Sequence, residues 1–141
     1  MEMTPYLSFN GQCEAAFTFY EQCLGGQRGP IFRYDGSPLA GQVPADWSDK
    51  IMHGSITLGD QVLMGGDVAP DRYEEPKGFS LSLQIESTAD AERIFNDLAG
   101  NGRVVMPLEK TFWAARFGMV VDRFGIPWLV NCEGSDQPSE T

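Results

Sequence analysis

One order of secondary structure elements is predicted twice along the chain, and this repeat limits the possible folds more than any other feature. Residues 4–66 read as a strand, a helix and three further strands, and the same order returns in residues 78–133. Each segment is too small to bury its own sheet face. We therefore expect an α+β fold of paired βαβββ modules, whose curved sheets form one cleft. A ferredoxin-like α/β plait is the alternative, but it would leave strands unused.

Both helices are predicted from apolar residues at helical spacing and from residues that favour helix ends. The first runs from about Gln12 to Leu24, and Gly25-Gly26 ends it, since glycine accepts the left-handed conformation past a helix. The second runs from about Thr88 to Ala99 and follows Ser87, a good N-cap residue. These signals place one helix in each module.

The strands are predicted from alternating apolar residues bounded by turn residues. They cover residues 6–9, 27–34, 51–58, 61–65, 78–86, 103–106, 115–122 and 127–132. Gly59-Asp60 is a tight turn, and residues 35–49 and 66–77 are loops. We expect residues 1–141 to form a single domain, in which residues 134–141 are a frayed tail.

The charge balance argues against nucleic-acid and membrane partners. The chain of 141 residues has 20 acidic and 10 basic side chains, for a formal net charge of −10. Such a charge repels nucleic acids and anionic lipids. No apolar run approaches the roughly 20 residues that span a bilayer, and no basic-then-apolar leader is visible. We expect neither a nucleic-acid nor a membrane partner.

The three cysteines are Cys13, Cys23 and Cys132, and none belongs to a C-x-x-C pair. Cys13 and Cys23 share the first predicted helix, where ten residues separate them by about 15 Å, too far for a disulfide. We interpret all three as small core residues rather than nucleophiles. This sparse set indicates a reducing, cytoplasmic location.

Three stretches carry a family resemblance: TPYLSFNGQCEAAFTFYEQCLGG, MHGSITLGDQVLMGGD and KTFWAARFGMVVDRFGIPWLVNCE. Together they resemble the vicinal oxygen chelate superfamily, which includes glyoxalase I, bleomycin-resistance proteins and extradiol dioxygenases. The spacing from Phe112 to Asn131 is similar to the PhnB-like, or demethylubiquinone-methyltransferase-like, branch of small bacterial proteins. The resemblance covers about Thr4 to Cys132.

The resemblance implies the glyoxalase/bleomycin resistance/dihydroxybiphenyl dioxygenase-like fold, a homodimer, and a reaction site inside the concave sheets. It does not make methyl transfer a good prediction. A methyltransferase usually has a Rossmann-like domain with a glycine-rich turn after its first strand. Here Gly25-Gly26 follows a helix, and Gly65-Gly66 comes after a strand with no helix following.

Enzymes of the superfamily hold a divalent metal that polarises oxygens of the substrate. Carried onto this sequence, three of the ligand positions fall at Pro5, Ser80 and Leu129, none of which is a good ligand. Their neighbours do not replace them. We therefore expect a degenerate site with no metal and no other cofactor.

His53 is the only histidine, and its role is open between three interpretations. It is a half-buried structural residue bonded to a carbonyl, a pocket acid or base that works near neutral pH, or a metal ligand with scattered carboxylates such as Asp67 or Glu133. We keep His53 as the candidate catalytic residue.

Aromatic residues supply the other candidates for a ligand site. The predicted ligand-binding residues, which we expect to wall the cleft between the modules, are Tyr6, Met64, Trp113, Phe117 and Trp128. The window Arg103 to Arg123 is locally basic. Its charges either attract an anionic ligand or lie solvated on an outer face.

Two functions remain after these arguments. The first is a protein that binds a small organic ligand in the cleft without a metal, as bleomycin-resistance proteins are understood to do. The second is an enzyme of the lyase, isomerase or dioxygenase type, either metal-independent with His53 as acid or base, or metal-dependent through other ligands. The missing ligands favour the first.

Overall fold

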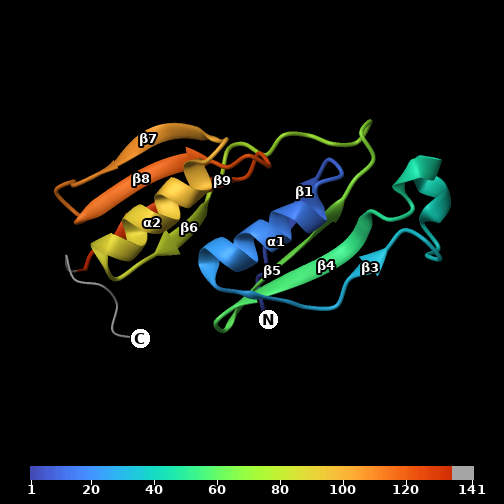
Figure 1. Cartoon of the computed structure of the whole chain (residues 1–141), viewed down its shortest axis with the longest axis horizontal. Helices are drawn as coiled ribbons and strands as arrows, with labels where there is room; N and C mark the ends of the chain where they lie inside the picture. The colour runs from blue at the N-terminus through green and yellow to red at the C-terminus, as the bar shows by residue number, and fades with distance from the viewer. Residues whose placement is uncertain (135–141) are drawn as a thin grey trace. The chain divides into compact units, whose positions relative to one another are not determined.

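The chain forms two compact units, Met1–Glu74 and Glu75–Thr141. The computed structural model describes residues 1–134, so all but the first residue of the predicted tail lies outside the described residues. Each unit contains one α-helix and one mixed sheet, as Figure 1 shows. The α+β class predicted from the sequence is confirmed. Within residues 1–134, neither α-helix has the length and apolar character needed to cross a bilayer.

The first unit follows the predicted β-α-β-β-β order, with one strand divided in two. Its elements are β1 (Tyr6–Phe9), α1 (Cys13–Leu24), β2 (Gln27–Arg28), β3 (Phe32–Arg33), the 3-10 turns η1 (Ala40–Gln42) and η2 (Ala45–Trp47), β4 (Ile51–Leu58) and β5 (Gln61–Asp67). The sheet order is β1-β5-β4-β2, and β3 also pairs with β4. β1 and β5 are parallel, whereas the other pairs are antiparallel.

The second unit repeats this topology. Its elements are β6 (Leu81–Gln84), α2 (Thr88–Ala99), β7 (Arg103–Glu109), β8 (Arg116–Val121) and β9 (Pro127–Cys132). The sheet order is β6-β9-β8-β7, with β6 and β9 parallel and the other pairs antiparallel. The repeated element order predicted from the sequence is therefore confirmed.

Each helix packs on one face of its own sheet (Figure 1), because the apolar stripe of the helix and alternate strand residues are buried together. In the first unit, the rings of Phe9 and Phe17 meet edge to face, with centroids 5.9 Å apart. In the second, a Cβ added at Gly118 would lie 2.8 Å from the Phe95 ring. The opposite face of each sheet carries no helix of its own unit.

The single strand predicted over residues 27–34 is wrong, because β2 and β3 are separate. Pro30 lies between them and has no N–H to donate to a ladder. Gly29 approaches β4 closely: its N–H donates to the Ser55 carbonyl at 2.9 Å, and an added Cβ would lie 2.5 Å from Ser55 Oγ. The Gly-Pro step therefore divides the strand.

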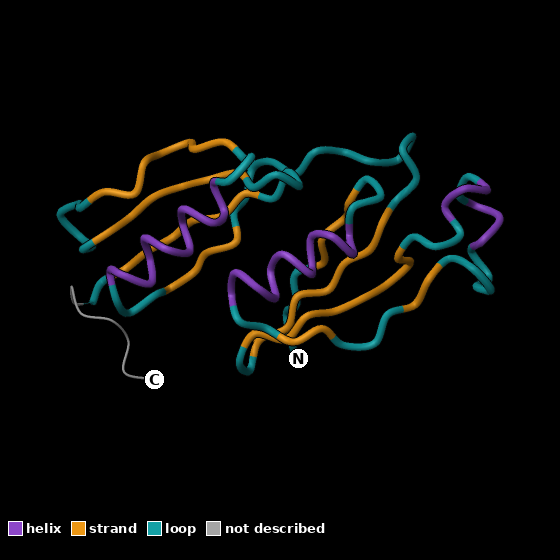
Figure 2. Tube along the Cα trace, viewed as in Figure 1, coloured by secondary structure: helices purple, strands orange, loops and turns teal. Residues whose placement is uncertain are grey.

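Other predicted boundaries differ by a few residues. β6 begins at Leu81 rather than residue 78, since Gly78 has a φ of +83°, outside the extended region. β7 extends to Glu109 and β5 to Asp67. The loop predicted over residues 35–49 contains the two short 3-10 turns, drawn in purple in Figure 2. The turn at Gly59-Asp60 is confirmed by the pairing of the residues on either side.

The two helices begin in different ways. Ser87 Oγ accepts a hydrogen bond from the Asp90 N–H at 3.0 Å, so the predicted N-cap of α2 is confirmed. At α1 the side chain of Gln12 makes no capping bond. Instead the buried carboxylate of Asp67, at the end of β5, accepts from the Cys13 N–H at 2.8 Å. The start of α1 therefore depends on a residue distant in sequence.

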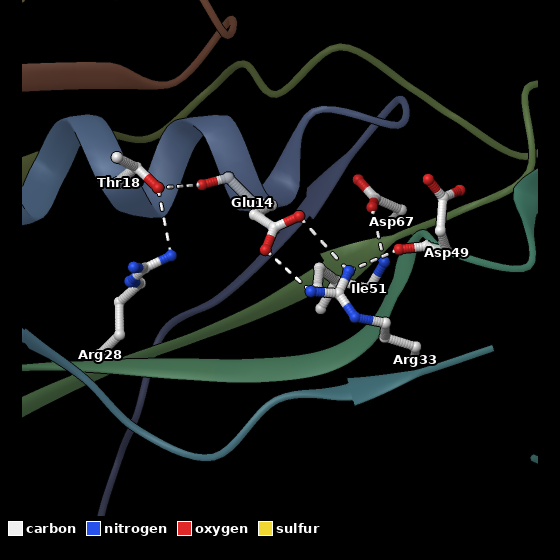
Figure 3. A network of polar contacts seen from close by, with 7 residues as sticks. All are labelled: Glu14, Thr18, Arg28, Arg33, Asp49, Ile51 and Asp67. Carbon is white, nitrogen blue, oxygen red and sulfur yellow. Dashed lines mark hydrogen bonds and ion pairs between the residues drawn. The ribbon is translucent and has the colours of Figure 1, made fainter. Parts of the chain in front are cut away.

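Ion pairs and hydrogen bonds also tie α1 to β2 and β3, and β3 to Asp49 before β4 (Figure 3). The Arg33 guanidinium donates to the Glu14 carboxylate at 2.9 and 3.3 Å, and to the Asp49 carbonyl at 2.6 Å. Arg28 donates to Thr18 Oγ1 at 3.2 Å. The Arg33 guanidinium lowers the pKa of the Glu14 carboxyl by hydrogen bonding to its charged form.

Candidate functional site

The helix-free face of the first sheet can be assigned from its glycines. Added Cβ atoms at Gly54 and Gly65 would lie 3.7 and 3.0 Å from the Phe17 ring of α1, so these positions face the helix. Strand residues alternate between faces, which places His53 and Met64 on the opposite side. Tyr6 pairs with Met64 across the β1–β5 ladder and so shares that face. Three of the predicted site residues, Tyr6, His53 and Met64, thus lie on one face of the first sheet.

Aromatic rings flank His53 on this face. The Tyr6 ring stacks on the imidazole at a centroid distance of 5.7 Å and an angle of 24°, and Phe32 lies 6.3 Å away on β3. The Tyr6 hydroxyl donates to the Met52 carbonyl at 3.4 Å, and burial raises the pKa of this phenol. The Tyr6 side chain is nevertheless 51% exposed, so a ligand can reach its ring. We name Tyr6, Phe32 and His53 the imidazole cluster.

The helix-free face of the second sheet is found in the same way. Gly118 faces Phe95 of α2 and pairs with Val130, so the adjacent residues Phe117 and Asn131 lie on the opposite face. Trp113, in the loop between β7 and β8, contacts Phe117 edge to face with centroids 5.2 Å apart. Trp113 is 49% exposed. The structure therefore brings Trp113 and Phe117 together.

A row of amide and hydroxyl groups runs beside these rings. Asn131 pairs with Phe117 on one side and with Gln84 on the other. Its Nδ2 donates to Gln84 Oε1 at 2.8 Å, and Gln84 Nε2 donates to Ser82 Oγ at 3.1 Å. We name Ser82, Gln84 and Asn131 the amide row. It places hydrogen-bonding groups beside the Trp113 and Phe117 rings.

Trp128 is placed differently from the other predicted ligand-binding residues. It is 1% exposed, and its Nε1 donates to the buried carboxylate of Asp122 at 2.8 Å. Its partner across the β8–β9 ladder is Val120, on the α2 side of the sheet, because Gly118 lies two residues before Val120 on the same strand. We assign Trp128 to the core of the second unit and exclude it from the candidate site.

Both carboxylate oxygens of Asp67 accept hydrogen bonds from backbone N–H groups. Asp67 is therefore not placed to share a metal ion with His53. It accepts from the Cys13 N–H through Oδ1, and from the Ile51 N–H at 3.0 Å through Oδ2 (Figure 3). Burial raises the pKa of the Asp67 carboxyl, while these hydrogen bonds oppose the rise. Burial and the Asp67 charge raise the pKa of the Cys13 thiol well above its ordinary value. Cys13 is thus a protonated core residue, as predicted for the cysteines.

The remaining cysteines agree with that interpretation, since Cys13, Cys23 and Cys132 are all free and buried. Two cations of the basic window predicted between Arg103 and Arg123 are engaged by the protein itself. Arg116 pairs with Glu92 at 3.3 Å, and Arg123 donates to the Gly100 carbonyl at 3.1 Å. These contacts favour the interpretation of charges on an outer face over attraction of an anionic ligand.

A divalent metal site needs several donor side chains that converge on one point. Over residues 1–134, no group of three or more His, Cys, Asp or Glu side chains is placed to hold an ion. Pro5 precedes β1, Ser80 precedes β6, and Leu129 pairs with Ser82. The residues at these positions do not fit the metal that the superfamily's enzymes use.

The sequence interpretation missed Phe32, Gln84 and Asn131 as site residues. Phe32 was treated as part of a strand, although its ring reaches His53. Asn131 is a polar residue within the apolar run of β9, which is a signal that could have identified it. Gln84 offers no such signal, because only the register of β6 against β9 places it beside Asn131.

This chain resembles known proteins in both sequence and fold. A sequence model of the Glyoxalase/Bleomycin resistance protein/Dioxygenase superfamily matches residues 4–130. Protein YjdN of Escherichia coli (strain K12) is 32% identical over 139 residues, which cover 93% of this chain and 95% of that protein.

Two solved structures are similar over nearly their whole length. The protein PA1353 of Pseudomonas aeruginosa has a TM-score of 0.86 and 50% identity, covering 96% of this chain and 99% of that one. A protein from Bacillus cereus, described as a putative 3-demethylubiquinone-9 3-methyltransferase, PhnB protein, has a TM-score of 0.81 and 25% identity, covering 94% and 99%.

Proposed function

The chain belongs to the glyoxalase/bleomycin resistance protein/dioxygenase superfamily, and from this premise we propose that it binds a small organic ligand on the helix-free faces of its sheets without a catalytic metal. The metal site of the superfamily is degenerate in this proposal, since Pro5, Ser80 and Leu129 stand where ligands would be needed. Binding then depends on ring stacking and hydrogen bonds rather than on chelation.

The observation that carries the proposal is the pair of half-exposed aromatic surfaces. Tyr6 and Trp113 each leave about half of their area open, and each lies against a second ring or an imidazole. Contiguous exposed apolar surface on a folded protein usually marks a binding site. Polar groups at the edge of each surface, His53 in one unit and Asn131 in the other, would orient the ligand.

Methyl transfer, which the description of the Bacillus cereus protein suggests, is not part of the proposal. Dinucleotide- and S-adenosylmethionine-type domains use a mostly parallel sheet with a glycine-rich turn after the first strand. In the described residues each sheet has one parallel strand pair, at β1–β5 and β6–β9.

An enzyme that uses His53 as acid or base is the second candidate. It is favoured by the position of the imidazole between Tyr6 and Phe32, where a bound ring would lie within reach of a proton donor or acceptor. Substitution of His53 by alanine separates the two functions. A binding protein loses affinity only in part, whereas an enzyme loses turnover and keeps binding.

A ligand screen read by thermal shift, followed by titration of the hits, tests the proposal. We expect Trp113→Ala to weaken binding at least about tenfold, since aromatic anchors dominate such sites. Phe79→Ala removes another exposed ring, before β6, and is the matched control. Elemental analysis of freshly purified protein should find no stoichiometric Zn, Ni, Mn or Fe. Equal affinity of the two variants, or one metal per chain, would contradict the proposal.

We also infer a homodimer in the cytoplasm. Three consecutive apolar residues of the edge strand β7, Val104 to Met106, are about half exposed, and a second copy would cover them. The free cysteines suit a reducing compartment. Sedimentation at micromolar concentration should give twice the mass of the chain, and a monomer would contradict this inference.

A further inference from the structure

We propose that the Oδ1 atom of Asn131 is a hydrogen-bond acceptor for the ligand, and that the ligand of the second unit is an uncharged ring compound with a hydroxyl or amino donor. This inference rests on the proposed function and names the chemical class that the site would take.

The first observation is an orphaned acceptor. Among the side chains of residues 1–134, Asn131 Oδ1 is the buried nitrogen or oxygen atom that has no hydrogen-bond partner. The Asn131 side chain is 8% exposed. A buried amide oxygen without a partner is destabilising, so native proteins rarely keep one without a purpose.

The second observation is the direction of the amide row. Asn131 donates to Gln84, and Gln84 donates to Ser82, so every bond of the row leads away from Asn131 Oδ1. If both amide groups were rotated by 180°, Asn131 Oδ1 would accept from Gln84 Nε2. The Asn131 amide nitrogen, which carries two hydrogens, would then occupy the position where Oδ1 now lacks a partner. Either direction leaves one polar group of Asn131 without a partner, and in the structure that group is the acceptor Oδ1 rather than the N–H donors.

The third observation is the neighbourhood of the acceptor. Phe117 is the cross-strand partner of Asn131, and Trp113 lies edge to face against Phe117. Trp113 is in the loop between β7 and β8, outside any strand pairing, and half of its area is exposed. A ring compound can therefore pack against Trp113 and Phe117, while its donor reaches Asn131 Oδ1 after a turn of these side chains.

The net charge of the chain and the contacts of its arginines narrow the chemical class of the ligand further. The chain has a formal net charge of −10, and Arg116 and Arg123 are engaged with Glu92 and the Gly100 carbonyl. Nothing in the amide row is cationic. A carboxylate or phosphate would meet an acceptor and a net negative charge, which disfavours anionic ligands.

The experiment compares pairs of probes that differ only in the donor: phenol with anisole, and indole with 1-methylindole. Dissociation constants are measured by ligand-observed NMR, which does not depend on tryptophan fluorescence. In the wild-type protein we expect phenol and indole to bind about tenfold tighter than their methylated partners, because a polar site discriminates against a ligand that leaves its buried group unpaired.

Three variants localise the effect. Asn131→Leu keeps the side-chain size but removes the acceptor, and should abolish the preference while anisole still binds. Asn131→Asp keeps an acceptor and should retain the preference. Asn96→Leu makes the same exchange at an exposed position of α2 and should behave as wild type.

Thermal unfolding without ligand tests whether Asn131 has only a structural role. Because Gln84 is exposed and can bond water in place of Asn131, Asn131→Leu should unfold at a temperature equal to or above that of the wild type. If Asn131 only supports the strand, the midpoint falls and the probe preference is unchanged.

The outcomes separate this inference from the proposed function. Equal binding of both members of each pair overturns the role of Asn131 and leaves the proposed function standing. Tighter binding of the methylated probes, or loss of all binding in Asn131→Leu, also overturns it. If no probe binds the wild type, the assigned class is wrong, and the wider ligand screen with Trp113→Ala decides the proposed function separately.

Discussion

The two units share one topology but secure it with different interactions. In the second unit, Ser87 caps α2 from the adjacent position, and Asp122 accepts from the N–H groups of Phe124 and Ile126 in its own turn. In the first unit, Asp67 at the end of β5 reaches back to the start of α1. The comparison teaches that the same element order can rest on local contacts in one half and on long-range contacts in the other.

Their helix-free faces differ as well. The first unit presents the His53 imidazole between two aromatic rings. The second presents an aromatic pair beside the amide row, which can only orient a ligand by hydrogen bonds. Under the proposed function, an acid or base would come from the first unit, and a neutral polar anchor for a ring would come from the second.

The largest expected effect comes from breaking the core of the second unit. Trp128→Ala should lower the free energy of unfolding by about 3–5 kcal/mol, because it leaves a cavity and removes the donor to Asp122. Trp113→Ala, at a half-exposed position, should cost less than about 1 kcal/mol. Urea denaturation followed by circular dichroism measures both. Similar losses in the two variants would show that Trp113 is also a core residue.

The next effect tests the long-range contact of the first unit. Asp67→Ala leaves the N–H groups of Cys13 and Ile51 without their carboxylate, and should destabilise the protein by about 3 kcal/mol. Asp71→Ala, at an exposed position, is the control and should be close to neutral. Thermal unfolding distinguishes them. A small loss at Asp67 would mean that water can replace the carboxylate.

A smaller effect is expected at the local cap of the second unit. Ser87→Ala should cost about 1 kcal/mol, the usual value of an N-cap bond. Gln12→Ala, at the corresponding position before α1, should cost almost nothing, since its side chain makes no capping bond. Chemical denaturation of both variants gives the comparison. An equal loss of stability in Gln12→Ala and Ser87→Ala would contradict this prediction.

The smallest effect concerns pH in the first unit. Arg33 lowers the pKa of Glu14, so the pair stabilises the folded state above the ordinary glutamate pKa of about 4.3, and this contribution is lost as pH falls through the lowered value. Because both side chains are substantially exposed, we expect about 0.5 kcal/mol at pH 7. Unfolding of the wild type and of Glu14→Gln, measured from pH 7 to pH 3, should therefore converge in acid. A constant difference would exclude the ion pair as its cause.

Local signals predicted much of the fold. Ser87 and the apolar spacing of residues 88–99 identified α2 with its observed bounds, and the turn at Gly59-Asp60 identified the β4–β5 hairpin. Pro127–Cys132 was also predicted with its observed ends. These succeeded because capping, helical periodicity and tight turns depend on residues within a few positions of each other.

The site was less predictable, because its residues come from strands whose pairing the sequence does not state. The structure places Tyr6, His53 and Met64 on one face of the first sheet. The two tryptophans that were predicted to line the same site differ, because Trp113 is half exposed whereas Trp128 is buried. Trp128 is buried because its position along β9, relative to Gly118 on β8, places it on the face that α2 covers, whereas Trp113 lies in the loop between β7 and β8.

The sequence by itself determined the repeated order of elements, the helix of each unit and the family, since these follow from short-range patterns and from motifs spread along the chain. Tertiary structure alone decided the cap of α1 by Asp67, the neighbourhood of Phe32 and His53, and the amide row that ends at Asn131 Oδ1. The physical reason is that sheet register brings distant residues within hydrogen-bonding distance, and register is fixed by burial of a whole face rather than by any local residue.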